Sequence, residues 1–281
     1  MKGGKELKNS LAYMEKDTPI HKLAGTSKLT AFILLSIIVM TSYDTRFLIL
    51  VMAISIYALR LAQIKWDDIS FLVKIVAGFS LINLIAIYIF EPEYGVGLYA
   101  SRSLLCQGFG RYSITKEQIF YELNVALKYF STIPLALVFI LGTDPSEFAA
   151  SLNSLGLSYK ISYAVALALR YIPDIQKSFE EIKEASQARG LEMSKKTSLG
   201  KRIKATTAII IPLIFDSLER IETISQAMEL RRFGKEKTRT WYKKRPLTKR
   251  DFLVVGLSIF LVILGIFLFF VNKGRFYNPF R

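Results

Sequence analysis

The sequence of 281 residues contains almost no cysteine or histidine, the side chains on which zinc binding and redox chemistry mainly depend. It has one cysteine, Cys106, and one histidine, His21. A single cysteine cannot form an intramolecular disulfide, and one histidine cannot build a zinc site without several further ligands. We therefore predict no cofactor and no metal site, and we interpret His21 as a packing residue where the first helix begins.

Nucleotide-binding and catalytic motifs are also missing. The phosphate loop G-x-x-x-x-G-K-[ST] does not occur, because Gly200-Lys201 lacks both the earlier glycine and the following hydroxyl. Neither a G-x-S-x-G turn nor an H-E-x-x-H helix is present. With one histidine and one cysteine, few routes to acid-base or nucleophilic work remain beyond carboxylates, so we predict that the chain is not an enzyme and not its own ATPase.

Negative charge is sparse, with 23 Asp and Glu against 38 Lys and Arg, a net charge of +15. Such an excess can indicate nucleic-acid binding. Here, however, the basic residues lie between and beside apolar runs, which is the pattern of cytoplasmic loops in membrane proteins. We therefore expect a lipid bilayer around the chain and no nucleic-acid partner.

Apolar residues are abundant, at 52% of the chain, and they are gathered into runs. A hydrocarbon core about 30 Å thick needs roughly 20 helical residues to cross it. Five runs approach that length, at 29–43, 47–62, 71–90, 118–141 and 252–271. The sequence thus predicts an all-α polytopic membrane protein with about five transmembrane helices, the first two forming a helical hairpin. Residues 91–117 are expected to form a long loop or a partial re-entrant segment.

The region from Thr143 to Arg250 has a different character, because apolar and charged residues alternate there with helical spacing. We expect a helix from Pro145 to Leu155, a helix from Tyr159 to about Pro173 or beyond, and charged helices over 175–189 and about 199–232, each of these last two followed by a glycine stop. An apolar stripe on the longest helix is expected to pack on another helix, and it comprises Ile214, Leu218, Ile221, Ser225 and Met228. Trp241 and Tyr242 are expected to meet the bilayer surface.

These features divide the chain into four parts. We predict a cytoplasmic N-terminal segment at 1–28, transmembrane helices 1 to 4 at 29–141, a cytoplasmic layer of amphipathic helices at 142–250, and a final transmembrane helix with a short tail at 251–281. The polar N-terminus predicts no cleaved signal peptide. The density of basic residues places the N-terminus and the 142–250 region in the cytoplasm, although Lys273, Arg275 and Arg281 then lie outside, against the rule.

Two charged helices of the cytoplasmic layer end in arginine. The first ends at Ala188-Arg189-Gly190 and the second at Leu230-Arg231-Arg232, followed by Gly234. An arginine near a helix C-terminus complements the macrodipole, so either tip alone has an ordinary structural role. Two such tips in one layer favour a shared role.

Both tips resemble the two Ala-Arg-Gly coupling motifs of the energy-coupling factor transporter T component, the CbiQ-like family. The segments 19–23, 143–147, 155–157 and 166–173 are similar to other parts of that family in the same order, so the resemblance spans about 19–270. The second motif departs from the family, because it reads Leu-Arg-Arg. Aligning Ala227-Met228 and Phe233-Gly234 with the family matches Arg231 to its arginine and Arg232 to its glycine.

The resemblance implies a coupling subunit of a prokaryotic plasma-membrane importer. Its partners would be two ABC ATPase subunits and a small substrate-binding membrane subunit, the S subunit. The six residues 188–190 and 230–232 would contact the ATPases. The cargo, a vitamin or a transition-metal ion, stays open, as does whether the subunit serves one S partner or several.

The alternative from another class is a self-sufficient channel or secondary transporter. Such a protein should gather polar side chains at the bilayer midplane, often in two similar halves. Only the fourth run offers candidates, Glu122, Asn124 and Lys128, and no internal repeat is seen. A membrane enzyme is the third possibility, but no group of residues supports it.

Overall fold

The computed structural model describes residues 16–108, 112–190, 198–236 and 239–280. The chain forms two compact units. Unit 1 comprises residues 1–147 and 244–281, and unit 2 comprises residues 148–243. The first unit is thus built from two separate stretches of sequence, and the second is a single insertion into it.

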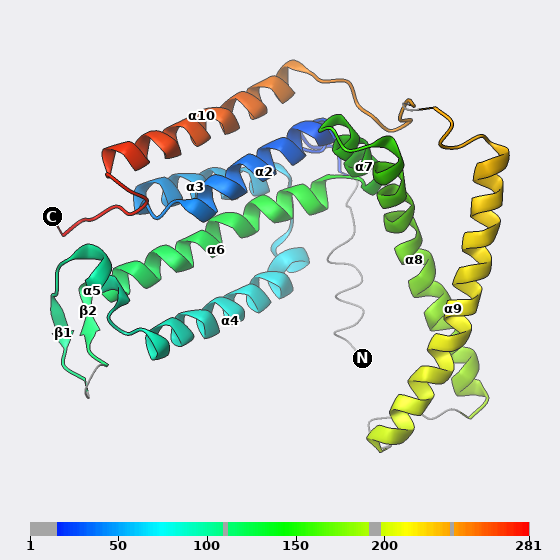
Figure 1. The fold of residues 1–281 in the computed structure, drawn as a ribbon, viewed down its shortest axis with the longest axis horizontal. Coiled ribbons are helices and arrows are strands. Elements are labelled where there is room, and N and C mark those ends of the chain that lie inside the picture. Colours follow the sequence, from blue (N-terminus) through cyan, green and yellow to red (C-terminus); the bar gives the residue numbers. More distant parts are fainter. Residues whose placement is uncertain (1–15, 109–111, 191–197, 237–238, 281) are drawn as a thin grey trace. The chain divides into compact units, whose positions relative to one another are not determined.

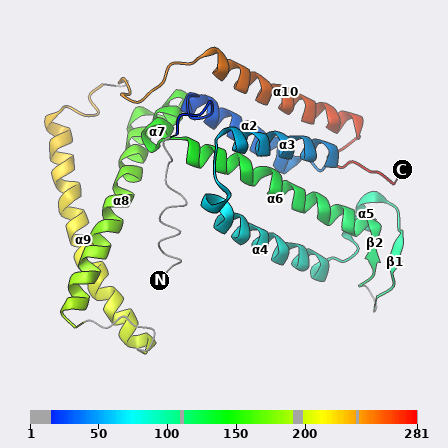
Figure 2. The same ribbon diagram turned by 180° about the vertical axis from the view of Figure 1, so that it is seen from behind.

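Unit 1 is a bundle of helices arranged around α6 (Figure 1). Its long helices are α2 (Gly25–Thr41), α3 (Thr45–Leu61), α4 (Trp66–Phe90), α6 (Lys116–Gly142) and α10 (Lys249–Val271). Helices α2, α3 and α4 pack against α6, and α10 packs against α2. Figure 2 shows the same order from behind. The predicted all-α polytopic membrane fold is confirmed.

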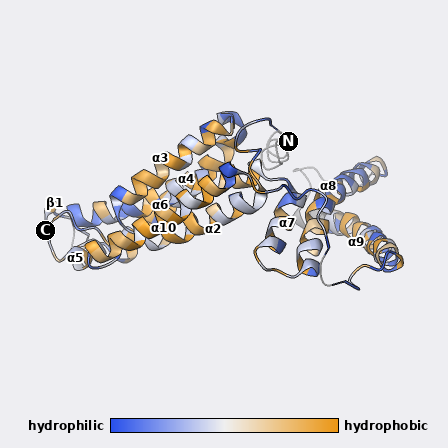
Figure 3. Cartoon of the chain, turned by 90° about the horizontal axis from the view of Figure 1, so that it is seen from above, coloured by the Kyte–Doolittle hydropathy of each residue, from blue (hydrophilic) through white to orange (hydrophobic). Residues whose placement is uncertain are grey.

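Three helices of the described chain, α4, α6 and α10, are long and apolar enough to cross a membrane. Helix α2 is apolar but has only 17 residues, about 26 Å at 1.5 Å per residue, and α3 has the same length. Figure 3 shows hydrophobic colouring over most of these helices and a mixed pattern on α9. The membrane region therefore combines three full-length apolar helices with two shorter ones.

The turn between α2 and α3 is fixed by Asp44, whose carboxylate accepts hydrogen bonds from the backbone N–H groups of Arg46 and Phe47. Near this turn, Ile38 and Val39 form one buried cluster with Phe47, Leu48 and Val51. Beyond the turn, each helix packs on α6 more than on the other. The predicted hairpin is therefore closed only at its tip.

A close approach between α10 and α2 depends on Gly265. A Cβ atom at this position would lie 2.5 Å from Cγ1 of Ile38, which is too short for any real contact. Because glycine has no side chain, the side chain of Ile38 can lie directly against the backbone of α10, a close packing that small residues permit in membrane bundles.

The stretch left open by the sequence, 91–117, forms regular structure in its described residues, 91–108 and 112–117. It contains the short helix α5 (Tyr94–Tyr99) and an antiparallel pair of strands, β1 (Leu104–Cys106) and β2 (Ile114–Thr115). Glu117, fully buried, accepts hydrogen bonds from the backbone N–H of Ser103 and the hydroxyl of Ser101. A small hairpin is thus tied to the first turn of α6, where a loop or re-entrant segment was expected.

The C-terminal tail packs back onto unit 1. Residue Tyr43 forms a parallel bridge with Phe276, and the side-chain amide of Asn278 donates to the carbonyl of Tyr99 at 3.1 Å. The ring of Phe280 lies 5.8 Å from that of Tyr99. The tail therefore joins the α2–α3 turn to α5.

Unit 2 contains most of α7 (Pro145–Ser154) and two long helices, α8 (Tyr159–Ala188) and α9 (Leu199–Leu230). The hydroxyl of Ser158 caps α8 by accepting from the N–H of Ile161. The prediction of two helices over 159–189 was wrong, because α8 runs unbroken through Pro173. Proline removes one backbone donor and can kink a helix, but this loss does not end it here.

Candidate functional site

The first arginine tip ends α8. Arg189 is the C-cap residue, with φ −83° and ψ 8°, and Gly190 follows at φ +89°. The N–H of Gly190 donates to the carbonyl of Gln187 at 2.9 Å. Ala188, Arg189 and Gly190 are all exposed. This left-handed glycine stops the helix and leaves the guanidinium at its end.

The second tip repeats this geometry at the end of α9. Arg231 is the C-cap residue, with φ −85° and ψ 10°, and Arg232 follows at φ +55°. The N–H of Arg232 donates to Glu229 O at 2.8 Å, and that of Phe233 donates to Met228 O at 2.9 Å. These two bonds make a Schellman motif, the usual ending of a helix at a left-handed residue.

The two endings give the register of the motifs. Arg189 and Arg231 both occupy the C-cap position, whereas Gly190 and Arg232 both occupy the left-handed position that follows. Leu230, Arg231 and Arg232 are exposed, like their counterparts on α8. Backbone geometry therefore pairs Arg231, and not Arg232, with Arg189.

The α9 tip is held by a cluster of aromatic rings that sequence reasoning missed. Phe233 lies 4.6 Å from Tyr163 between ring centroids, and Trp241 lies 5.2 Å from Tyr159. The indole N–H of Trp241 donates to Oδ1 of Asn153 at 3.1 Å. Trp241 thus packs within unit 2, where a bilayer anchor was expected, and Tyr242 beside it is fully exposed.

Burial, with the nearby phenol of Tyr163, raises the pKa of Tyr159 above its ordinary value. The ring is therefore neutral at physiological pH, as suits a residue packed among other rings. Only the spacing of aromatic residues between 159 and 163 could have hinted at this cluster. Nothing in the sequence pairs them with residues about 70 positions later.

The side of α9 that is buried is not the predicted apolar stripe. Ile214, Leu218 and Ile221 are 50%, 55% and 58% exposed. The buried side of α9 carries Ala205 and Ile209 and continues one residue before the predicted stripe, at the partly buried Leu213. Helices α8 and α9 do pack together. Among the described residues of unit 2 the stripe has no partner helix, so its packing on another helix stays a prediction.

The polar residues of the fourth apolar run are engaged in helix packing. The side-chain oxygen of Asn124 accepts from the hydroxyl of Thr45 at 2.8 Å. The ammonium of Lys128 donates to the carbonyl of Met40 at 2.7 Å and lies over the ring of Tyr43. Both side chains are buried, and Glu122 bonds to Gln118 of the same helix. Asn124 and Lys128 thus join α6 to its neighbours, whereas Glu122 stays within α6.

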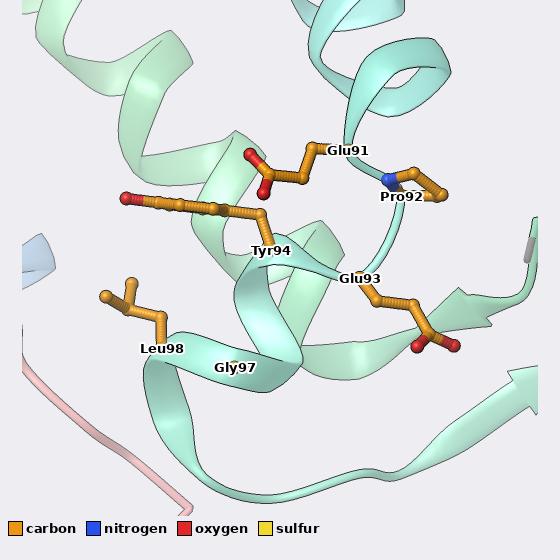
Figure 4. Close-up of a pocket in the computed structure, with 6 residues that line it drawn as sticks. All are labelled: Glu91, Pro92, Glu93, Tyr94, Gly97 and Leu98. Carbon is orange, nitrogen blue, oxygen red and sulfur yellow. The ribbon is translucent and has the colours of Figure 1, made fainter.

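An open hollow of about 440 Å³ lies beside α5 (Figure 4). The carboxylate of Glu91 lies near the ring of Tyr94, whereas Glu93 points away from it. Glu93 is already paired, because Arg102 Nη2 donates to its carboxylate at 2.7 Å and Ser113 at 3.1 Å. Among the described residues, no group of three or more potential metal ligands occurs.

Comparison with known proteins decides the family. The profile of the family CbiQ, described as cobalt transport protein, matches residues 16–242. The chain belongs to the CbiQ family. This confirms the resemblance to T components that the two arginine tips carry.

Several relatives of this CbiQ-family chain are named energy-coupling factor transporter transmembrane protein EcfT. The protein of Streptococcus equi is 27% identical, over 92% of this chain and 94% of its own length. That of Staphylococcus aureus is 25% identical, over 92% and 98%. That of Exiguobacterium sibiricum is 28% identical, over 59% of this chain and 65% of its own length, so this match spans slightly under two thirds of that relative.

Another relative carries a different name. A putative ABC transporter ATP-binding protein of Bifidobacterium longum is 29% identical, over 56% of this chain but only 21% of its own length. A segment similar to this CbiQ-family chain thus forms about a fifth of that longer protein.

Proposed function

We propose that this chain is the coupling subunit of an energy-coupling factor importer. In this role it transmits the ATP-driven motion of two ATPase subunits to a small substrate-binding membrane subunit. The observation that carries the proposal is the matched pair of helix ends. Arg189 and Arg231 share one backbone geometry, and each presents an exposed side chain at the end of a long helix.

The geometry of unit 2 supports two separate docking points. Helices α8 and α9 cross and run in opposite directions (Figure 1), so their C-terminal ends lie at opposite ends of the pair. A helix of 30 residues is about 45 Å long. One groove cannot receive both tips, which favours one ATPase subunit for each arginine.

Arginine suits such a docking point. Its guanidinium stays charged and offers a planar fork of donors to carboxylate or carbonyl acceptors. Among the residues that the structure describes, no side-chain hydrogen bond or ion pair occupies either Arg189 or Arg231. The name of the Bifidobacterium longum relative, an ABC ATP-binding protein, supports ATPases as the acceptors.

The exposed stripe of α9 is the proposed contact for the substrate-binding membrane subunit. Ile214, Leu218 and Ile221 form an apolar row on a helix whose other side is packed. An apolar row of this kind suits a partner that is itself apolar. Cargo recognition would rest with that partner, which leaves vitamins and metal ions both open.

We propose that unit 2 and the N-terminus face the cytoplasm. The support is the density of Lys and Arg around unit 2, in agreement with the positive-inside rule. ATPase subunits bind ATP in the cytoplasm, so the same orientation is required by the proposed role. Hydrolysis would be carried out by those subunits, and this chain would be non-catalytic.

Co-purification tests the proposal. The chain, expressed with the ATPase and membrane subunits of its host, should retain two ATPase subunits and hydrolyse ATP. Arg189→Ala and Arg231→Ala should each weaken ATPase binding by about 1.5 to 3 kcal/mol, or roughly 10- to 150-fold, the worth of hydrogen bonds to a charged group. Arg232→Gly is the matched control and should bind normally. Full binding by both alanine variants would contradict the proposal.

A further inference from the structure

The chain leaves unit 1 and returns to it at neighbouring points of that unit. The chain leaves unit 1 after Glu147 and re-enters it at Lys244. The side chains of Glu147 and Arg245 lie 3.9 Å apart, between Oε1 and Nε. The outgoing and returning segments are therefore in contact within unit 1, although about 100 residues separate them in sequence.

Glu147 is the centre of a buried cluster. Glu147 is only 4% exposed, and its Oε1 accepts a hydrogen bond from the N–H of Gly25 at 2.6 Å. Lys28, equally buried, places Nζ 3.7 Å from Oε2 of Glu147 and 2.6 Å from the carbonyl of Gly142. The outgoing segment is thus bonded to the first turn of α2, and that turn is bonded to the last residue of α6.

The returning segment is bonded to the same part of the chain. Nη1 of Arg245 donates to the carbonyl of His21 at 2.5 Å. The carboxylate of Asp251, 1% exposed, accepts from the N–H of Ala24 at 2.8 Å and from Thr248 at 2.7 Å. These bonds fix the start of α10 to the segment before α2.

Stability alone does not account for a cluster of this kind. A buried ion pair recovers little more than its desolvation cost, and apolar residues of similar volume often stabilise as well or better. Compared with apolar contacts, charged groups add geometric specificity, because each of their hydrogen bonds fixes the position of its partner. A cluster of such bonds is useful where several segments of the chain must keep fixed distances from one another while the protein changes conformation.

We propose that Glu147, Lys28 and Arg245 form a joint that makes the two interunit segments move together. Any displacement of unit 2 then reaches the start of α2, the end of α6 and the start of α10 at once. The joint rests on the proposed coupling function, since it explains how motion at the arginine tips enters the membrane helices. Glu147, Lys28 and Arg245 are positioning residues, which act through the helices that they hold.

Spin labels on the two segments test the joint in the assembled complex. Cys106, the exposed native cysteine, is first replaced by serine. Cysteines then replace Ser146 and Lys244, and each carries a nitroxide. The distance between the labels is measured in nanodiscs containing the chain with its co-purified ATPases, without nucleotide and with ADP–vanadate. The wild-type background should give one narrow distance distribution that is the same in both states.

Arg245→Gln is the decisive variant, because its side chain is 44% exposed and its loss leaves the buried Lys28–Glu147 pair in place. Its label distance should broaden and shift between the two states. Arg102→Gln, in another half-exposed ion pair of unit 1, is the matched control and should behave as wild type. Glu147→Gln should repeat the effect.

Three results would overturn the joint. One is a wild-type distance that changes with nucleotide, and another is an unchanged distance distribution in Arg245→Gln. The third is failure of Arg245→Gln to assemble while Arg102→Gln assembles, which would assign the cluster to folding. Failure of the proposed function would look different, because the wild-type chain itself would then capture no ATPase.

Discussion

Arg232 carries a side chain in a backbone region where the Cβ atom crowds the following carbonyl. Its φ is +55°, whereas the matching position of the other tip holds Gly190. The left-handed conformation costs a non-glycine residue about 1 to 2 kcal/mol. The backbone strain at Arg232 can therefore be tested by substituting this residue alone, while Arg231, the proposed ATPase contact, is left unchanged.

Arg232→Gly should therefore stabilise the protein slightly. Relief of the strain is partly offset by the greater entropy of glycine in the unfolded chain, about 0.5 to 1 kcal/mol, so the net gain is on the order of 0.5 kcal/mol. Thermal unfolding in detergent measures it. Gly190→Ala is the reciprocal variant, and its unfolding temperature should fall. A fall in Arg232→Gly would contradict the strain assigned to the α9 tip.

Asp44 predicts a pH dependence. Burial tends to raise the pKa of this carboxyl, but hydrogen bonds from Arg46 and Asn272 outweigh that effect and hold the pKa below its ordinary value. A lowered folded pKa stabilises the protein above the unfolded pKa of about 3.9, and this stabilisation is lost as pH falls through the folded pKa.

Asp44→Asn should thus lower stability at pH 7 by about 1 to 2 kcal/mol, since it keeps the cap but loses the charged hydrogen bonds. The gap to wild type should begin to narrow as the pH falls below about 5 and should close once the pH has passed through the folded pKa, measured by thermal unfolding. Asp17→Asn removes an exposed ion pair with Lys22 and serves as control, with little effect at either pH. A gap that stays constant over this range would refute the assignment.

Individual helix ends were largely predictable from the sequence. Pro145, Ser158 and Gly190 each signal a boundary through short-range chemistry, and the structure has a boundary at each. Family register pairs Arg231 with Arg189, and these two residues share the C-cap position of their helices. The buried bonds of Lys28 and Glu147 were not predictable, because the two residues are 119 positions apart and no local pattern joins them.

At the scale of elements, α9 shows why a periodic pattern is ambiguous. Apolar residues cover more than one side of this helix, and adjacent residues differ by about 100° in direction. Both the predicted stripe with Ile214 and the buried side with Ile209 satisfy helical spacing. Only tertiary packing decides which one is covered.

The exposed stripe gives a prediction about partners. Replacing Ile214, Leu218 and Ile221 together by serine should change the free energy of unfolding by no more than about 0.5 kcal/mol per site, since exposed positions are tolerant. Capture of the small substrate-binding subunit should fall sharply, measured by co-purification. Ile209→Ala, at a fully buried site, should instead destabilise by about 2 to 5 kcal/mol. Normal capture by the serine variant would exclude the stripe as the contact.

Two elements escaped prediction for physical reasons. The continuity of α8 through Pro173 depends on the rest of the helix tolerating one missing hydrogen bond. The strands β1 and β2 are only three and two residues long, too short for any alternation to be seen. Their pairing is supported by contacts with α6, which the local sequence does not contain.

For the whole molecule, we predict that the isolated chain does not bind small ligands. The purified chain alone should bind neither ATP nor a vitamin nor Co²⁺, because the sequence has no phosphate loop and the described residues hold no group of metal ligands. Isothermal titration measures this, with the assembled complex as the positive control for ATP. Saturable micromolar binding by the isolated chain would favour a self-sufficient transporter.

Class and membrane character followed from composition, because apolar runs of about 20 residues have the length that a helix needs to cross a bilayer. The four predicted parts describe sides of the membrane and stay a prediction. The two compact units are a different division, by contacts, in which Thr143 to Glu147 group with unit 1, and Glu147 accepts from the N–H of Gly25 there. Bonds between residues so far apart in sequence have no local pattern that could predict them.

The contact between Glu147 and Arg245 also bears on how the chain could be cut and rejoined. The two ends of the inserted stretch 148–243 emerge side by side, which is the condition under which domain insertions are tolerated. A linker of about five residues, spanning up to roughly 17 Å, could bridge the gap left by deleting the insert. Chimaeras that exchange residues 148–243 with those of a relative would keep every membrane helix native and change only the insert.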